Sequence, residues 1–185
     1  MGQSQDQPPT KDRPVLETGR LLLRHPDRRD AESIIAIAGD WEVAHRLARI
    51  PHPYGKKDAD FFIDVIVPNE WVWPITWRRS GALIGMAGLS PDTERDVAEL
   101  GYYVERRHWD MGVATEAARA VVTYGRQVLG LRLITSGYFL DNPASGRVLA
   151  KLGFVEAGCS ERPCLAAGST VAAVDMHLQH GGNPL

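Results

Sequence analysis

Residues 99–120 constrain the fold more than any other segment, because the chain changes there from a strand-like to a helix-like pattern at a glycine-containing turn. Before this point, three strand-like segments follow one another at 71–77, 83–89 and 97–104. After it, helix-like and strand-like segments alternate. A meander followed by such an alternation predicts a mixed sheet with helices packed on it, in an α+β or α/β domain.

The rest of the chain is expected to complete a single domain. A length of 185 residues suffices for one well-buried core and gives little reason to expect two. Residues 1–14 are polar and contain prolines, so we predict a disordered tail there and one folded domain over 15–185. Further helices are expected after the turn at 26–27 and at 42–47, 58–67, 115–129 and 142–152, and further strands at 21–23, 131–139, 154–159 and 171–179.

The composition excludes several classes of protein. With 21 basic and 23 acidic residues the net charge is -2, so the positive charge of a general nucleic-acid binder is missing. No apolar run approaches the roughly 20 residues needed to span a bilayer, and the N-terminus lacks the apolar core of a signal peptide. Cys159 and Cys164 are too few for a disulfide framework and lack the partners of a zinc site. We therefore expect a reduced, cytoplasmic protein without metal or membrane contact.

The turn at 109–114 predicts a cradle for a phosphate group. The first N–H groups of a helix have no intrahelical partners, and the helix dipole is positive there, so an anion can dock on main-chain donors. Gly112 lets the backbone approach a ligand closely, and the small Ala114 leaves the helix mouth open. For this segment alone, an ordinary strand-to-helix turn is an equal alternative.

A second helix start, after the strand expected at 131–139, carries two polar residues. Asn142 and Ser145 lie three positions apart, so both can face one ligand. Asparagine and serine are also among the best N-cap residues, and a purely capping role for Asn142 stays open as an alternative.

The motifs resemble the GNAT acetyltransferase superfamily and, within it, the RimJ/RimL-like branch. Six segments match in the order of that family: LETGRLLLR (16–24), PHPYGKKDADFFI (51–63), LIGMAGL (83–89), ELGYYV (99–104), GVATEAARAVVTYG (112–125) and NPASGRVLAKLGF (142–154). The resemblance implies a single GNAT-like domain over 15–185, with a bent, mixed, mostly antiparallel sheet flanked by helices on both faces. It also implies acetyl-CoA as co-substrate and transfer of the acetyl group to a primary amine.

The same resemblance assigns the acetyl-CoA contacts. Trp109 and Asp110 depart from the general loop pattern, in which Gln or Arg and a glycine are common, and the Asp110 carboxylate has to point away from a bound pyrophosphate. The implied contact residues are Tyr103, Val104, Trp109, Asp110, Met111, Gly112, Val113, Ala114, Thr115, Asn142 and Ser145.

Two residues are candidates for catalysis. Glu99 lies on the strand that would carry the thioester, and we expect it to act as a general base through a water molecule; a solvent-facing glutamate is the alternative. Many members of the superfamily donate a proton to the leaving thiolate from a tyrosine at the position of Leu149, so the resemblance to the RimJ/RimL-like branch favours Ser145 for that role here.

The acceptor is the least constrained part of the prediction. Trp41, Tyr54 and Trp73 could wall an amine pocket through cation–π contacts, with core packing as the alternative. A protein N-terminus or a small amine is expected as acceptor; a drug- or polyamine-modifying enzyme and a non-catalytic acyl-CoA-binding module stay open. A C-terminal strand with a free edge could mediate a homodimer.

Overall fold

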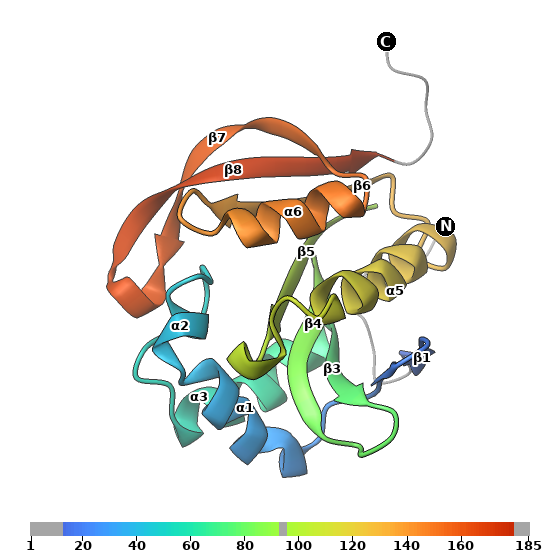
Figure 1. The fold of residues 1–185 in the computed structure, drawn as a ribbon, viewed down its shortest axis with the longest axis vertical. Helices are drawn as coiled ribbons and strands as arrows, with labels where there is room; N and C mark the ends of the chain where they lie inside the picture. The colour runs from blue at the N-terminus through green and yellow to red at the C-terminus, as the bar shows by residue number, and fades with distance from the viewer. Residues whose placement is uncertain (1–12, 93–95, 180–185) are drawn as a thin grey trace, which may run out of the picture.

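A computed structural model describes residues 13–92 and 96–179. Its strands form one mixed sheet in the order β1-β2-β3-β4-β5-β6-β8-β7, in which the β5–β6 pair is parallel and the other six neighbouring pairs are antiparallel (Figure 1). This confirms the predicted fold class. The strands are β1 (Leu16–Glu17), β2 (Leu21–Leu23), β3 (Trp71–Trp77), β4 (Leu83–Pro91), β5 (Val97–Val104), β6 (Leu133–Phe139), β7 (Val155–Cys164) and β8 (Ser169–Gln179).

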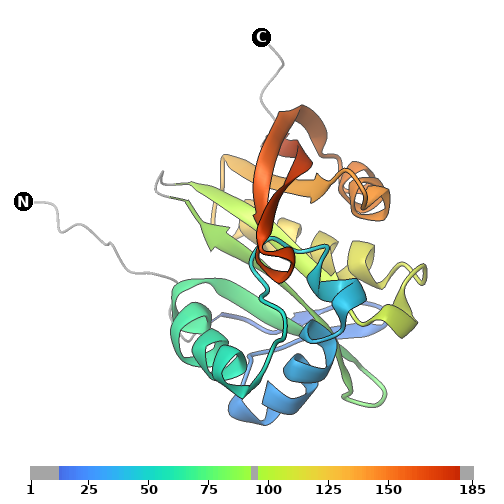
Figure 2. The ribbon, with the colours of Figure 1, turned by 90° about the vertical axis from the view of Figure 1, so that its left-hand side faces the viewer.

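Helices cover both faces of the sheet, and Figure 2 shows α3 and α5 on opposite sides of it. The main core lies between the sheet and α5 and α6, and a second apolar cluster lies between β3, β4 and the helices α1 and α3. The helical elements are η1 (Arg28–Asp30), α1 (Ala31–Ala38), α2 (Trp41–Ala44), α3 (Lys56–Phe61), η2 (Phe62–Ile66), α4 (Val67–Asn69), η3 (Arg106–His108), α5 (Val113–Gln127), α6 (Pro143–Lys151) and η4 (Leu165–Ala167).

The predicted bounds agree best where apolar periodicity is strong. Both β3 and β5 have the predicted ends. By contrast, β7 continues to Cys164, beyond the predicted end at residue 159, because it forms a long hairpin with β8 that is paired up to Cys164 and Ser169. Most of its side chains are exposed, so no alternating apolar pattern marks its second half.

The first described residues are fixed against the sheet. The predicted tail falls mostly on residues 1–12, which lie outside the described residues. Arg13 is buried and donates from Nη1 to the carbonyl oxygen of Val72 (2.8 Å) and from Nη2 to that of Val67 (2.5 Å). The indole N–H of Trp73 donates to the Pro14 carbonyl oxygen (2.8 Å). Residues 13 and 14, at the end of the predicted tail, are therefore held against the sheet. An arginine can do this because it buries its apolar stem while its guanidinium bonds buried carbonyl groups.

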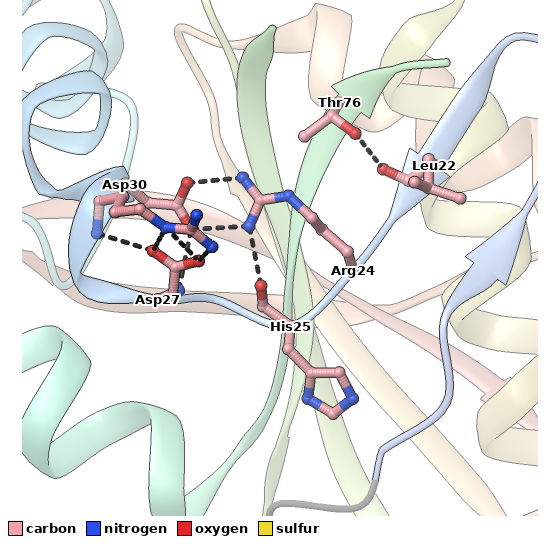
Figure 3. A network of polar contacts seen from close by, with 7 residues as sticks. Leu22, Arg24, His25, Asp27, Asp30 and Thr76 are labelled. Atoms are coloured by element: carbon pink, nitrogen blue, oxygen red, sulfur yellow. Dashed lines mark hydrogen bonds and ion pairs between the residues drawn. The ribbon is translucent and has the colours of Figure 1, made fainter. Parts of the chain in front are cut away.

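A charged junction holds β2 to the first helical turns (Figure 3). The Arg24 guanidinium donates to both carboxylate oxygens of the buried Asp30 (2.8 and 2.6 Å), and the bonds to Asp30 raise the pKa of Arg24. Asp30 also accepts the backbone N–H of Asp27 (2.9 Å), which completes a capping box. On the neighbouring strand, Thr76 Oγ1 donates to the Leu22 carbonyl oxygen (2.7 Å).

Within residues 13–92 and 96–179, no helix is long and apolar enough to cross a membrane, and no group of three or more His, Cys, Asp or Glu side chains is arranged to hold a metal ion.

Candidate active site

The strands β5 and β6 separate part-way along their length. Their parallel pairing covers three residue pairs and ends at Glu99 and Thr135. One side-chain bond follows, from Ser136 Oγ to the Leu100 carbonyl oxygen (2.9 Å). Beyond it, β5 continues to Val104 in register with β4, while β6 continues in register with β8. The facing edges of β5 and β6 therefore present backbone groups that an extended ligand can bond as an added strand does.

The end of β5 is fastened to the turn that precedes α5. The Trp109 indole N–H donates to the Val104 carbonyl oxygen (2.8 Å), and the Arg46 guanidinium lies 5.0 Å from the indole ring centroid. The side chain predicted to contact a cofactor thus holds the strand end against the turn.

Two residues of this turn adopt left-handed backbone conformations. Asp110 has φ 58° and Gly112, the N-cap of α5, has φ 74°. Aspartate is among the few side chains that tolerate this region, which accounts for Asp110 where a glycine is common. Met111, between them, is exposed.

The first turn of α5 offers backbone rather than side chains to a ligand. Val113 is fully buried in the main core, so only its N–H can reach a ligand, and Ala114 and Thr115 are half-buried. N–H groups at this end have no intrahelical acceptors, and the helix dipole favours an anion there. The turn has the left-handed backbone and the open helix start on which the phosphate-cradle prediction depends, and phosphate binding itself stays a prediction.

Glu116, the acidic residue in the first turn of α5, is bonded to the N-terminal part of the chain. The Glu116 carboxylate accepts bonds from Thr18 Oγ1 (2.6 Å) and from the Arg20 backbone N–H and side-chain Nε (2.9 and 2.7 Å). Burial raises the pKa of Glu116, but these bonds outweigh burial and hold its pKa below the usual value. Its charge is therefore compensated by the N-terminal hairpin β1–β2.

Asn142 caps α6, and Ser145 contacts a tyrosine of β5. Asn142 Oδ1 accepts the Ser145 backbone N–H at 3.4 Å, so the capping alternative is present in the structure. The Tyr102 hydroxyl lies 2.9 Å from Ser145 Oγ and donates to the Ser145 carbonyl oxygen (3.1 Å). Burial raises the pKa of Tyr102 to about 12, so this phenol is neutral. Tyr102 was not among the predicted site residues. It lies three positions after Glu99, so strand alternation places the two side chains on opposite faces of β5.

Glu99 lies on the face of β5 opposite α5 and α6 and is held by a distant arginine. Glu99 Oε1 accepts a bond from Arg162 Nη1 of β7 at 2.5 Å. Arg162 Nη2 also donates to Asp175 Oδ1 of β8 (2.7 Å). The Glu99 side chain is 44% exposed, as expected of a solvent-facing glutamate, but it is paired with Arg162. No sequence pattern linked these residues, which lie 63 positions apart.

The three predicted acceptor residues do not converge. Trp73 is fully buried in the main core, with its ring centroid 5.3 Å from that of Tyr124 on α5. Tyr54 belongs to the second apolar cluster, on the other face of β3. Trp41 is 43% exposed and stacks on His45 with a centroid distance of 5.3 Å. The shared-pocket prediction is therefore corrected for Trp73, because strand alternation turns it toward α5.

The Tyr103 side chain is likewise directed into the second cluster, next to Tyr54. Burial raises the pKa of Tyr103, so its phenol stays neutral. Only the backbone of Tyr103 is left for the predicted cofactor contact, and the same holds for the buried Val104.

Most of the chain matches a known protein family. The model of the acetyltransferase (GNAT) domain matches residues 20–155, which is more than half of the chain. The uncharacterized N-acetyltransferase YoaA of Bacillus subtilis is 34% identical over 157 residues, covering 78% of this chain and 85% of the relative.

Solved structures share the fold. A GNAT-family acetyltransferase from Bacillus anthracis superimposes with a TM-score of 0.79 at 19% identity, covering 89% of this chain and 98% of the other. The ribosomal-protein-S5-alanine acetyltransferase of Vibrio fischeri gives 0.77 at 16% identity, covering 90% and 97%. The spermidine N-acetyltransferase of Vibrio cholerae, in complex with CoA and spermine, gives 0.75 at 20% identity, covering 88% and 96%.

Proposed function

Because this chain belongs to the GNAT acetyltransferase family, we propose that it transfers the acetyl group of acetyl-CoA to a primary amine by direct attack of the amine on the thioester. The observation that carries this proposal is the separation of β5 and β6 between the starts of α5 and α6. An extended thioester arm fits such a gap, with its diphosphate at the mouth of α5.

The residues that would hold acetyl-CoA supply mainly backbone groups. The edge of β5 up to Tyr103 and Val104 would bond the pantetheine arm. The turn from Trp109 to Gly112 and the first N–H groups of α5 would bind the diphosphate, and Asn142 and Ser145 would line the gap from α6. Backbone N–H groups near Val104 would stabilise the developing oxyanion.

The two candidate catalytic residues lie on opposite sides of this gap. Glu99 projects from one face of β5, and Ser145 is reached by Tyr102 from the other. We infer that the amine arrives on the side of Glu99, which takes its proton through a water molecule. The thiolate would leave on the side of Ser145, whose hydroxyl would donate a hydrogen bond to it while accepting one from the neutral Tyr102 phenol.

For the acceptor, we favour a monoamine, either a protein N-terminus as in the RimJ/RimL-like branch or a small molecule. Three carboxylates in the region of Glu99 already have cationic partners. Glu99 and Asp175 share Arg162, and Glu70 bonds Arg49 Nη2 (2.6 Å). A polycation needs several uncompensated carboxylates, so the polyamine alternative, favoured by the likeness to the spermidine enzyme, ranks second.

A thiol-release assay tests the proposal. Wild-type protein receives acetyl-CoA and a panel of amino acids, peptides with free N-termini, aromatic monoamines and spermidine. We expect turnover with a monoamine or peptide, and a loss in kcat of about 10²- to 10³-fold in Glu99→Gln and about 10-fold in Ser145→Ala. Binding of acetyl-CoA without turnover of any acceptor would favour the non-catalytic module instead, and a preference for spermidine would contradict the monoamine assignment.

A further inference from the structure

The side chain of Arg162 joins four strands, β5, β6, β7 and β8. It extends from β7, bonds Asp175 Oδ1 on β8 through both Nη2 and Nε (2.7 and 3.1 Å), and reaches Glu99 on β5 through Nη1 (2.5 Å). The intervening strand β6 contributes the Ser136 carbonyl oxygen, 3.4 Å from Nη2. The guanidinium therefore lies over β6, at the place where β5 and β6 part.

The strand beneath the guanidinium carries no side chain at this place. A Cβ atom added to Gly137 would lie 2.6 Å from Arg162 Cζ and 2.7 Å from Nη2, closer than real Cβ contacts. Gly137 is the register partner of Asp175, so the anchor carboxylate and the vacant surface lie side by side. Any larger residue at 137 would push the guanidinium off the sheet.

The anchor is itself supported. Ser160 Oγ donates to Asp175 Oδ1 (3.0 Å), from the same strand as Arg162. Burial lowers the pKa of Arg162, but its bonds to Asp175 and Glu99 outweigh burial and leave the pKa above the usual value. The guanidinium is thus a fixed positive charge with Asp175 on one side and Glu99 on the other.

The position of Glu99 makes this contact relevant to the reaction. Glu99 forms the last β5–β6 residue pair, and only the bond from Ser136 to Leu100 lies between it and the gap for the thioester. A glutamate on a strand edge has several accessible rotamers, and a displacement of about 1 Å in a reacting group can cost on the order of 10²-fold in rate. The bond from Arg162 restricts Glu99 to one placement.

We propose that Arg162 is a positioning residue for the acetyl transfer: anchored on Asp175 and seated over Gly137, it holds the Glu99 carboxylate at the apex of the β5–β6 gap. The inference rests on the proposed function, in which Glu99 is the general base. Nothing in the mechanism requires Arg162 to touch acetyl-CoA or the amine.

A double-mutant cycle on the full chain tests it. Wild type, Arg162→Met, Glu99→Gln and the double variant are compared for kcat with the best acceptor of the panel, for KM of acetyl-CoA and for Tm. If Arg162 acts through Glu99, Arg162→Met lowers kcat about 10- to 100-fold with the KM of acetyl-CoA unchanged, and the double variant is no slower than Glu99→Gln alone. Arg162→Lys, which keeps the charge, recovers part of the loss.

Arg28→Met is the matched control, because Arg28 forms an ion pair with Asp64 (2.7 Å) between exposed side chains at the N-terminal helices, and kcat should not change. Gly137→Ala is the second variant: it displaces the guanidinium without removing a charge, and should match Arg162→Met.

The outcomes distinguish the role of Glu99 as the base from the role of Arg162 in positioning it. A kcat in Glu99→Gln equal to wild type contradicts the base assigned under the proposed function, and the role of Arg162 falls with it. A slow Glu99→Gln combined with additive losses in the double variant overturns the role of Arg162 alone. Wild-type or faster turnover of Arg162→Met overturns it as well, since the arginine would then only occupy the place of the acceptor amine.

Discussion

The two faces of β5 are built from different kinds of interaction. On the face covered by α5 and α6, the site consists of helix starts, left-handed turn residues and backbone groups, set on the main apolar core. On the opposite face, it consists of charged side chains that pair across strands, as Arg162 does with Glu99 and Asp175. Backbone geometry suits a co-substrate with an invariant diphosphate arm, whereas side-chain pairs can change with the acceptor.

The largest expected effect is a loss of stability in Trp73→Ala. This variant tests whether the helix-covered face serves stability rather than acceptor binding. Trp73→Ala removes a fully buried indole from the main core and leaves a cavity against Tyr124. We expect a loss of about 3–5 kcal/mol in the free energy of unfolding, measured by urea titration. Trp41→Ala, at an exposed position, should cost under about 1 kcal/mol. A folded Trp73→Ala variant with an altered KM for the amine alone would contradict this assignment.

The next effect concerns the phosphate cradle. Gly112→Glu places bulk and negative charge at the start of α5 in a left-handed conformation, and we expect acetyl-CoA affinity, measured by calorimetry, to fall about 10- to 100-fold. Gly81→Glu is the control, since Gly81 has a similar φ of 71° with open space around it, in the β3–β4 turn. Equal acetyl-CoA affinities of the two variants would contradict the placement of the phosphate cradle at Gly112.

The smallest effect concerns the neutral Tyr102 phenol on the helix-covered face of β5. The pKa of Tyr102 rises to about 12 on folding, so the folded state retains a proton that the unfolded state loses near pH 10. The associated stability is present below pH 10 and is lost as the pH rises toward 12. We expect Tyr102→Phe to show a shallower decline in Tm across this range than wild type. An identical decline would show that Tyr102 is not the group that titrates; Tyr54, whose pKa also rises to about 12, contributes a background common to both proteins.

Sequence reasoning succeeded where structure follows from neighbouring residues. The ends of β5 are encoded by apolar alternation and by the turn that follows it, whereas α5 begins at Val113, directly after Gly112, and not at the predicted residue 115. The role of Trp73 was misassigned because alternation predicts that Trp71, Trp73 and Trp77 of β3 share one face but does not say which face is covered by helices.

The contacts of Glu99 lay beyond such reasoning for a different reason. Arg162 is one of many arginines in the chain, and its nearness to Glu99 depends on the strand order β5-β6-β8-β7 and on the curvature of the β7–β8 hairpin. Neither leaves a local pattern. Tyr102 was missed on similar grounds, because its partner Ser145 is 43 residues away on another element.

The short β5–β6 pairing also affects where the sheet begins to unfold. Three residue pairs connect the sheet from β1 to β5 with the sheet from β6 to β8, far fewer than the seven between β4 and β5. Among the neighbouring strands from β3 to β7 this pairing is the shortest, and local opening is easiest where few bonds must break, so this part of the sheet opens first between β5 and β6. A co-substrate bonded to the edges of both strands would stabilise the connection between β5 and β6. Its concentration in the cell would then set the lifetime of the enzyme as well as its rate.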